Sequence, residues 1–411
     1  MRRMMTWQMV LIVCVLCSCV VGAFAQDWPQ WRGTNRDGKA AGFSVPETWP
    51  QALTQSWRVH LGGTDATPAL VGDKLYVYSR EDDQETVSCL NAADGSVIWQ
   101  DKVTAPAIGG PAARQHPGPR ATPAVAEGRV VTVGIVGVIS CLDAETGALL
   151  WRKDPFPGVT PAFFASASPL IADGLAIAFL GGPRNGALIA FDLATGDEKW
   201  RWAAEGPDYG SPVLMTAGGV KQVVTLTEKS VVGVSLADGA LLWQIPFATA
   251  RMAYNAATPI IDGQTVIYSG RARGTTAVRV EKQGDAFAAS QLWTNSEIGV
   301  QFSTPVLQDG FLYGLSDKGN LFCLSAEDGR TMWSDETQRD RGSFGPMVAA
   351  GTAIFCLPSS GQLIAFRAEP EGFTPLTEYK VAEAPVFGHP VLSGSRVFVQ
   401  DQAGVTLWTL P

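Results

Sequence analysis

The chain of 411 residues has few histidines and little charge. It contains three histidines, and charged residues make up 17% of it, against roughly 25% in an average domain. Lys and Arg number 31 against 39 Asp and Glu, a formal net charge of −8. This balance excludes the basic surface that nucleic acids and anionic membranes require, so we expect neither as a partner. So few histidines also argue against a histidine-based metal centre.

Long apolar runs are missing except at the start of the chain. Basic residues there precede an apolar stretch over residues 9–21, and an A-x-A pattern ends at Ala25. These features predict a secretory signal peptide over residues 1–25. No later segment reaches 18 uninterrupted apolar residues, so we expect no transmembrane span. A Leu-Cys-Ser-Cys sequence ending at Cys19 loosely resembles a lipobox, which leaves a lipid anchor as the alternative to free export.

Cysteine is scarce beyond that segment, and no two cysteines are adjacent. Cys89, Cys141, Cys323 and Cys356 remain. Disulfides are common in exported chains, so four cysteines raise that alternative. However, the first three occupy one repeated strand position, and equivalent strands of successive repeats lie beyond disulfide reach. We therefore expect four small buried thiols.

Glycine and proline, in contrast, are abundant, and one phrase recurs along the chain. There are 44 Gly and 26 Pro, which indicates many turns and an all-β chain. Residues 90–99 read L-N-A-A-D-G-S-V-I-W, a strand, a tight turn with Gly at positive φ, and a second strand that carries an aromatic residue. The aromatic residues that end the successive copies are Trp99, Trp151, Trp200, Trp243, Trp293, Trp333 and Tyr379.

A second marker, a small or polar residue followed by Pro and an apolar strand, fixes the period. It occurs at Pro68, Pro123, Pro169, Pro212, Pro259, Pro305, Pro346 and Pro390, with a mean spacing of about 46 residues. Four short strands fit in each period, which is the pattern of a propeller blade. The sequence therefore predicts a single eight-bladed β-propeller, with seven blades and one degenerate unit as the alternative.

The two ends of the chain predict how the ring closes. Only three strands follow Pro390, and the missing outer strand is available at residues 55–59, which carry Trp57. We expect this N-terminal strand to complete the last blade, so that an arm over residues 26–52 precedes a propeller over residues 53–411. Trp57 and the seven repeated aromatics are predicted to dock between blades, each tryptophan N–H donating to a backbone carbonyl. Trp28, Trp31 and Trp49 are expected to dock the arm across blade edges.

The repeated D-A-x-T/D-G-x-x-x-W, as at residues 143–151 and 192–200, resembles the tryptophan-docking repeat of pyrroloquinoline-quinone (PQQ) proteins. The resemblance covers nearly the whole chain after residue 25. It implies one of two branches, the PQQ-dependent alcohol and glucose dehydrogenases or the non-catalytic PQQ-like propellers of the BamB type. The second branch implies a scaffold that presents loops to protein partners.

Missing parts favour the scaffold branch. The chain is shorter than the dehydrogenases and lacks the adjacent cysteine pair that caps their quinone. Ca²⁺ needs clustered oxygen ligands, whereas Asp208 and Asn255 are predicted to be isolated in different blades. We therefore expect no catalytic residue, no metal and no cofactor. The alternative is a PQQ-dependent dehydrogenase with PQQ and Ca²⁺, or another small-ligand or sugar-binding enzyme, that uses the central channel. Clustered carboxylates and a stacking tryptophan in the channel would favour an enzyme, and a plugged or featureless channel beneath an apolar, arginine-rimmed face would favour a scaffold.

Three long connections between blades are the predicted partner site, over residues 100–122, 152–168 and 244–258. Long loops on a rigid scaffold commonly carry function, and arginine and aromatic residues are typical interface anchors. The predicted partner-binding residues are Arg114, His116, Arg120, Phe163, Phe164, Arg251, Met252, Tyr254 and Asn255. The alternative is that these loops only cover the channel mouth. We expect a monomer in the periplasm or at the outer-membrane periphery that binds an envelope or outer-membrane protein.

Other polar residues are assigned structural roles. His60, His116 and His389 lie on unrelated strands and loops without metal-ligand spacing, and we interpret them as satisfied structural or surface side chains. Arg271 and Arg273, within a Gly-Arg-Ala-Arg-Gly sequence, are expected to be solvated turn residues.

Overall fold

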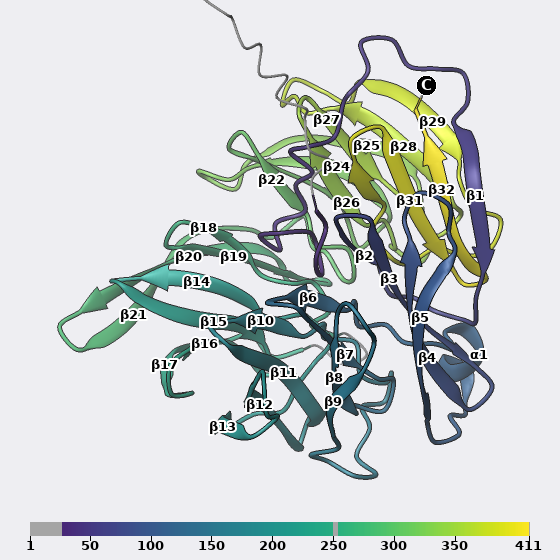
Figure 1. The fold of residues 1–411 in the computed structure, drawn as a ribbon. Coiled ribbons are helices and arrows are strands. Elements are labelled where there is room, and N and C mark those ends of the chain that lie inside the picture. Colours follow the sequence, from purple (N-terminus) through teal and green to yellow (C-terminus); the bar gives the residue numbers. More distant parts are fainter. Residues whose placement is uncertain (1–26, 250–253, 411) are drawn as a thin grey trace, which may run out of the picture.

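The computed structural model describes residues 27–249 and 254–410. Over these residues the chain forms eight four-stranded antiparallel sheets arranged in a ring (Figure 1). The predicted eight-bladed β-propeller is therefore confirmed, and the seven-blade alternative is wrong. The signal peptide over residues 1–25, Cys19, Arg251 and Met252 lie outside the described residues.

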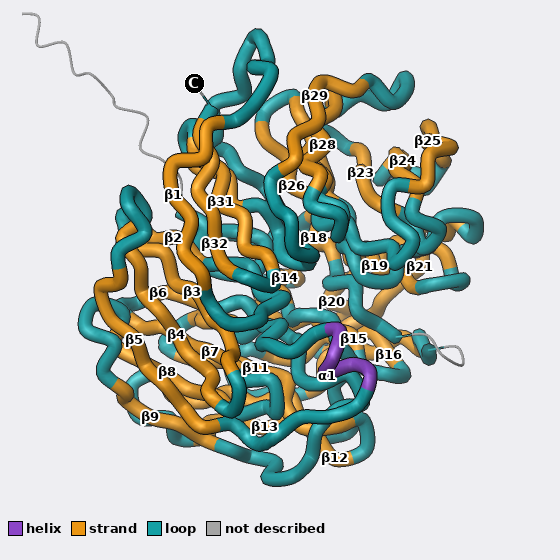
Figure 2. Tube along the Cα trace, turned by 90° about the vertical axis from the view of Figure 1, so that its right-hand side faces the viewer, coloured by secondary structure: helices purple, strands orange, loops and turns teal. Residues whose placement is uncertain are grey.

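Each blade runs from an innermost to an outermost strand, and almost all of the described chain is strand or loop (Figure 2). The strands in chain order, blade by blade, are β2 (Ala69–Val71), β3 (Lys74–Glu81), β4 (Gln84–Asn91) and β5 (Val97–Thr104); β6 (Ala124–Ala126), β7 (Arg129–Val133), β8 (Ile139–Asp143) and β9 (Leu149–Lys153); β10 (Leu170–Ala172), β11 (Leu175–Gly182), β12 (Asn185–Asp192) and β13 (Glu198–Trp202); β14 (Val213–Ala217), β15 (Val220–Leu226), β16 (Ser230–Ser235) and β17 (Leu241–Pro246); β18 (Ile260–Asp262), β19 (Thr265–Gly270), β20 (Gly274–Gln283) and β21 (Ala286–Asn295); β22 (Val306–Gln308), β23 (Phe311–Leu315), β24 (Asn320–Ser325) and β25 (Thr331–Gln338); β26 (Met347–Ala350), β27 (Ala353–Cys356), β28 (Gln362–Arg367) and β29 (Pro375–Lys380); and β30 (Val391–Ser393), β31 (Arg396–Asp401), β32 (Gly404–Thr409) and β1 (Thr54–His60). A five-residue helix, α1 (Pro111–Gln115), lies in the connection between the first two blades.

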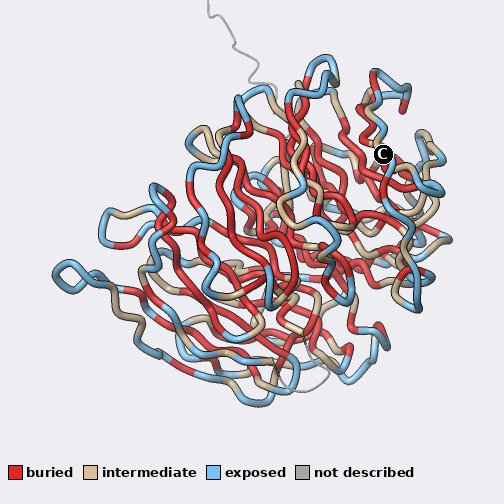
Figure 3. The backbone as a smooth tube through the Cα atoms, turned by 90° about the horizontal axis from the view of Figure 1, so that it is seen from below, coloured by how far each residue is buried: buried red, intermediate tan, exposed pale blue. Residues whose placement is uncertain are grey.

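The middle strands of the blades are buried on both faces because neighbouring sheets pack against each other. All six residues of β16 are buried, and five of the six residues of β24 are buried. The outermost strands alternate instead: in β5 only Trp99 is buried. Figure 3 shows this gradient, with buried segments toward the middle of the molecule and exposed turns at its rim. The four cysteines beyond the signal segment are free and buried, as expected from their strand positions.

The N-terminal strand closes the ring. β1 pairs with β32 in antiparallel register from Thr54 opposite Thr409 to His60 opposite Gly404, and the purple and yellow strands lie side by side in Figure 1. Arg58 of β1 holds the buried carboxylate of Asp401 through two hydrogen bonds of 2.9 and 3.0 Å. Two such parallel bonds fix geometry as well as charge. The first strand of the propeller is therefore locked to the last blade, as predicted.

The residue before each marker proline forms a belt around the ring axis. In six of the eight copies, its backbone N–H donates to the side-chain hydroxyl of the corresponding residue in the next blade. The bonds, each between 2.7 and 3.2 Å, run from Thr67 to Thr122, Thr122 to Ser168, Ser168 to Ser211, Ser211 to Thr258, Thr258 to Thr304, and from His389 to Thr67. This belt explains why Ser or Thr precedes the proline in six of the eight copies. Gly345 and His389 occupy the other two positions.

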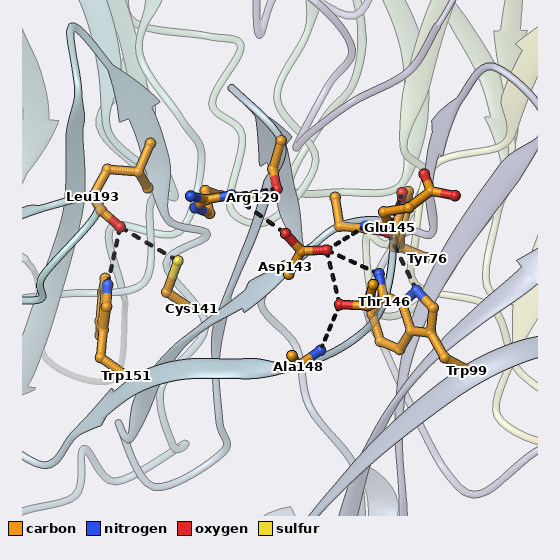
Figure 4. A network of polar contacts seen from close by, with 12 residues as sticks. Tyr76, Trp99, Arg129, Cys141, Asp143, Glu145, Thr146, Ala148, Trp151 and Leu193 are labelled. Atoms are coloured by element: carbon orange, nitrogen blue, oxygen red, sulfur yellow. Dashed lines mark hydrogen bonds and ion pairs between the residues drawn. The ribbon is translucent and has the colours of Figure 1, made fainter.

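The recurring turn phrase locks each blade to the preceding one (Figure 4). In the second blade the Asp143 carboxylate accepts hydrogen bonds from the backbone N–H and the hydroxyl of Thr146, which shapes a tight turn. The turn places Gly147, at φ 73°, against the indole of Trp99 from the preceding blade. The Trp99 N–H donates to the carbonyl of Ala144 over 3.2 Å. Each copy of the repeated segment therefore supplies a turn that packs against the preceding blade and an aromatic side chain that packs against the following one.

The same lock recurs around most of the ring. The donor–acceptor pairs are Trp57 with Ala92, Trp99 with Ala144, Trp151 with Leu193, Trp200 with Leu236, Trp293 with Ala326 and Trp333 with Glu369, and the Tyr379 hydroxyl donates to Pro50. Trp243 differs, because its N–H donates to Gln222 Oε1 of its own blade. Here β20 and β21 form a longer hairpin than the other blades have, so the usual acceptor turn is replaced.

Substitution of Gly147 tests this lock directly. A Cβ at Gly147 would lie 2.5 Å from the Trp99 ring, whereas one at Gly128, which has nearly the same φ, meets nothing within 4 Å. We expect Gly128→Ala to cost about 1 kcal/mol for the backbone, and Gly147→Ala to cost about 2–4 kcal/mol because overpacking adds to it. Urea unfolding of both variants measures the difference. Equal losses would show that the turn does not lock the blades.

The described part of the arm, residues 27–52, crosses one end of the ring axis. It pairs with the innermost strands of four blades: Trp28 with Leu70, Pro29 with Val125, Ala40 with Ala349 and Ser44 with Gly394. Two arginines of the arm are buried at the axis without a carboxylate partner. Arg32 donates to the carbonyls of Thr304 and Pro305 over 2.7 and 2.8 Å, and Arg36 donates to those of Ser168 and Pro169 over 3.1 and 2.8 Å. The arm therefore ties together blades from all around the ring.

Candidate functional site

A cavity of about 440 Å³ lies on the ring axis, at the end opposite the arm's strand contacts. Its lining comes from all eight connections between an outermost strand and the next innermost strand, which places it at the centre of the face formed by those connections, the loop face. The lining residues are Trp31, Asp65, Pro111, Ala112, Gln115, His116, Arg120, Phe163, Ser166, Tyr209, Ser211, Tyr254, Ala256, Phe302, Ser303, Gly342, Phe344, Pro346, Phe387 and His389. Phe163 is 40% exposed, so the cavity reaches the surface there.

Aromatic side chains form two arcs around this cavity. In the first, the Phe163 ring meets Tyr254 edge-on at a centroid distance of 4.7 Å, and Tyr209 lies 5.6 Å from Tyr254. In the second, Phe302 stacks on Phe344 at 4.4 Å, and Phe387 meets Phe344 at 4.9 Å. These rings come from six different connections, and together they form much of the apolar wall of the cavity. Such walls bind flat apolar groups.

The inner end of the cavity is formed by the arm and the belt. Trp31 donates its N–H to the Thr258 hydroxyl over 3.0 Å and meets the His389 ring edge-on at 4.6 Å. His389 is 2% exposed, and neither ring nitrogen has a hydrogen-bond partner among the described residues. Burial, with a smaller effect of the nearby Arg32, holds the pKa of His389 well below its usual value. The imidazole is therefore neutral, with one free donor and one free acceptor.

Arg120 supplies a positive charge to the cavity. Its Nη2 donates to the carbonyl of His116 over 3.2 Å, and its guanidinium lies over the Phe164 ring at 5.0 Å. Its Nη1 is buried and has no hydrogen-bond partner in the described structure. Burial lowers the pKa of Arg120, but arginine stays charged in proteins. An unpaired guanidinium nitrogen in an apolar cavity is a strong site for an anion.

The lining contains one carboxylate, that of Asp65, which is already engaged. Asp65 Oδ2 lies 2.6 Å from His116 Nδ1, and Oδ1 accepts a bond of 2.8 Å from Gln402. His116 also meets the Phe387 ring at 4.6 Å. Over the described residues no group of three or more His, Cys, Asp or Glu side chains could hold a metal ion.

The predicted partner-binding residues fall into three groups. His116, Arg120, Phe163 and Tyr254 line the central cavity. Arg114 is exposed on α1 and lines a second, smaller hollow. Phe164 and Asn255 are buried, so their side chains do not reach the surface. Phe164 has φ 65° and packs against Ala113.

Asp208 and Asn255 were predicted to be isolated, and this is wrong. The backbone N–H of Asn255 donates to Asp208 Oδ2 over 2.6 Å, because the two neighbouring connections lie against each other. The expectation that Arg273 is a solvated turn residue is also wrong. Arg273 stacks over Phe247 at 3.9 Å and donates to Asn255 Oδ1. A guanidinium thus completes this cluster.

Asp208 is expected to make the folding stability depend on pH in the mildly acidic range. Burial raises the pKa of Asp208 to about 6, above the unfolded value near 3.9. The folded state therefore binds this proton more tightly, and stability falls as pH rises from about 4 to about 6. We expect Asp208→Asn to remove this slope and to be up to about 3 kcal/mol more stable at pH 7.5.

Melting temperatures between pH 4 and 8 measure the effect. Asp94→Asn is the control, because hydrogen bonds from Ser96 lower the pKa of that exposed carboxyl, so its effect on stability falls mainly below about pH 4 and the variant should keep the slope of the unmodified protein. An unchanged slope in Asp208→Asn would contradict the assignment.

Sequence reasoning missed His389 as a cavity residue, and it treated all three histidines as satisfied or surface side chains. His389 is buried yet unsatisfied, which corrects that interpretation. One signal was present: His389 is the single marker residue before proline that is neither small nor a hydroxyl side chain. Phe302, Phe344 and Phe387 were also missed, because they lie in short connections.

Comparisons with known proteins place the chain among PQQ-like propellers. The model of the family described as "Outer membrane protein assembly factor BamB" (PQQ_2) matches residues 49–117 and 112–335. Outer membrane protein assembly factor BamB of Moranella endobia is 25% identical over 300 residues, which cover 70% of this chain and 74% of that one. Tetrathionate hydrolase of Acidithiobacillus ferrooxidans is 26% identical over 177 residues, or 40% of this chain. The chain spans only 33% of that protein.

Solved structures of both branches share the fold. BamB of Moraxella catarrhalis superimposes with a TM-score of 0.65 at 15% identity, over 87% of this chain and 98% of that one. Quinohemoprotein alcohol dehydrogenase of Comamonas testosteroni gives 0.67 at 15% identity, over 93% of this chain and 80% of that one. At this identity the two likenesses show the fold alone.

Proposed function

The chain belongs to the family of outer membrane protein assembly factor BamB, and from this premise we propose that it is an exported, non-catalytic β-propeller scaffold that binds protein partners in the cell envelope. It acts as a monomer in the periplasm or at the periphery of the outer membrane. The predicted signal peptide supports export. No helix over the described residues is long and apolar enough to cross a membrane.

The loop face is the proposed partner surface, and one observation carries the proposal. Rings from six connections and the charged side chains of Arg120 and Arg114 gather on this face, while Phe163 stays 40% exposed. Aromatic and arginine side chains around a central hollow are the usual anchors of protein interfaces. Phe164 and Asn255 support this face from below and are not part of the contact.

The closed axis also supports a scaffold. The arm occupies the end of the axis away from the loop face, and Trp31 forms the inner end of the cavity. A ligand therefore enters only from the loop face, and a partner seated there would cover it.

A PQQ-dependent dehydrogenase is the second candidate, favoured by the fold likeness to the quinohemoprotein enzyme. A calcium-bound quinone needs several oxygen ligands in one place. Asp65 has both carboxylate oxygens engaged, and Arg273 completes the cluster of Asp208 and Asn255. These residues do not fit a calcium-bound quinone. We propose that the protein works without a cofactor.

Titration of the purified protein with PQQ and CaCl₂ tests this proposal, with quinone absorbance and melting temperature as readouts. The scaffold account predicts no calcium-dependent PQQ binding and no dye-linked oxidation of ethanol or glucose. Saturable PQQ binding that requires Ca²⁺ and raises the melting temperature, as expected for a ligand of the native state, together with dye-linked oxidation of either substrate, would overturn it in favour of the dehydrogenase.

A further inference from the structure

His389 departs from the pattern of the belt. Six of the eight belt positions carry a hydroxyl that accepts the N–H of the preceding blade, and His389 carries an imidazole instead. Its own N–H keeps its belt bond to Thr67, at 2.8 Å. Only its side chain differs from the other belt residues. This imidazole lines the cavity, and both of its nitrogens are unpaired among the described residues. A buried imidazole without a partner costs stability, which a ligand would restore.

Arg120 presents a second unpaired polar atom to the same cavity. Phe164 beneath the guanidinium and the His116 carbonyl fix its orientation. Nη1 is left buried and free among the described residues. Two independent side chains, from connections more than 250 residues apart, therefore present unused hydrogen-bonding atoms to one aromatic-walled space.

We propose that this cavity binds a small, flat, largely apolar molecule that carries one acidic group, such as an aromatic carboxylate. The acidic group pairs with Arg120, the ring lies between the two aromatic arcs, and His389 hydrogen-bonds a polar atom at the inner end. The volume of about 440 Å³ falls within the range of small-molecule sites. A partner on the loop face would cover this cavity, but the ligand proposal does not depend on partner binding, since the isolated propeller is enough to test it.

The lining excludes other ligand classes. A cationic ligand would meet Arg120, while the one carboxylate of the lining, Asp65, is already engaged. A sugar would need hydrogen-bonding groups on most sides, whereas the surface of this lining is mainly apolar and seven of its 20 residues are Phe, Tyr or Trp. An aromatic acid matches both the wall and the free guanidinium nitrogen.

The test compares three naphthalene ligands of similar size by isothermal titration calorimetry, in buffer with EDTA so that no divalent cation assists binding. We expect naphthylacetate to bind saturably, naphthylacetamide to bind at least about tenfold more weakly, and naphthylmethylamine not to bind. Arg120→Gln should weaken naphthylacetate about 10- to 100-fold, as for a lost charged hydrogen bond, and leave naphthylacetamide unchanged. His389→Thr, which restores the usual belt residue, should weaken both ligands.

Arg330→Gln is the control, because Arg330 is an exposed arginine in the turn before β25 and does not line this cavity. It should bind naphthylacetate like the unmodified protein. Absence of binding by all three ligands, or equal affinity of the acid and the amide with no effect of Arg120→Gln, would overturn the proposal. If Arg120→Gln does not fold, the ranking of the three ligands on the unmodified protein still decides it. If the ligand proposal fails this test, the proposal that the loop face binds a protein partner still stands.

Discussion

Trp151→Ala is expected to destabilise the propeller by about 3–5 kcal/mol, the range for removing a buried large aromatic side chain. The Trp151 ring is buried between its own blade and the next, where it contacts Phe191 and the turn at Gly196. Its N–H donates to the carbonyl of Leu193 over 3.0 Å. The substitution therefore removes both the ring packing and the hydrogen bond of one interblade contact. Urea unfolding followed by tryptophan fluorescence and circular dichroism measures the loss.

Two further variants separate the contributions. Trp151→Phe keeps most of the ring and loses the donor, so it should cost about 1–2 kcal/mol. Leu150→Ala, on the same strand but exposed, should stay within about 0.5 kcal/mol. A loss from Leu150→Ala as large as that from Trp151→Ala would show that the strand, and not the lock, carries the effect.

Arg32→Ala is expected to cost about 3–5 kcal/mol and to release the arm. The Arg32 guanidinium is fully buried and donates to the carbonyls of Thr304, Pro305 and Asp37. Bonds from a charged donor are worth about 1.5–3 kcal/mol each, and the carbonyls would be left buried without partners. Arg32→Lys should not rescue, because an ammonium lacks the planar fork that reaches several acceptors. Limited proteolysis should cut residues 27–52 faster in both variants.

Lys39→Ala is the control for this prediction. It lies on the same arm, and no hydrogen bond or ion pair of its side chain occurs in the described structure. It should leave both stability and proteolysis unchanged. Equal proteolysis of Arg32→Ala and the unmodified protein would mean that the tryptophans alone hold the arm.

The fold could be predicted because every blade repeats the same local chemistry. The turn with its glycine and the strand with its tryptophan lie within about ten residues of each other, so sequence alone reveals each copy. Ring closure followed from the number of strands left after Pro390. Trp243 shows the limit: its N–H turns to Gln222, because the next blade lacks the short turn.

The cavity could not be predicted because its residues come from all eight connections. Short loops, such as those carrying Phe302 and Phe344, looked unimportant one at a time, and only the ring geometry brings them together. Asp208 and Asn255 meet for the same reason. The buried arginines of the arm were missed because nothing in a short arginine-containing sequence reveals carbonyl acceptors more than 100 residues away.

The central claim is that the loop face binds a protein partner in the envelope. Photo-crosslinking in cells tests it most directly, with one crosslinking residue placed at Phe163 on the loop face and one at Leu241 on an outermost strand. The two positions are 40% and 42% exposed, so accessibility is matched. The account predicts a discrete adduct from Phe163 in the outer-membrane fraction and none from Leu241. Equal adducts from both positions, or an adduct from Leu241 alone, would contradict it.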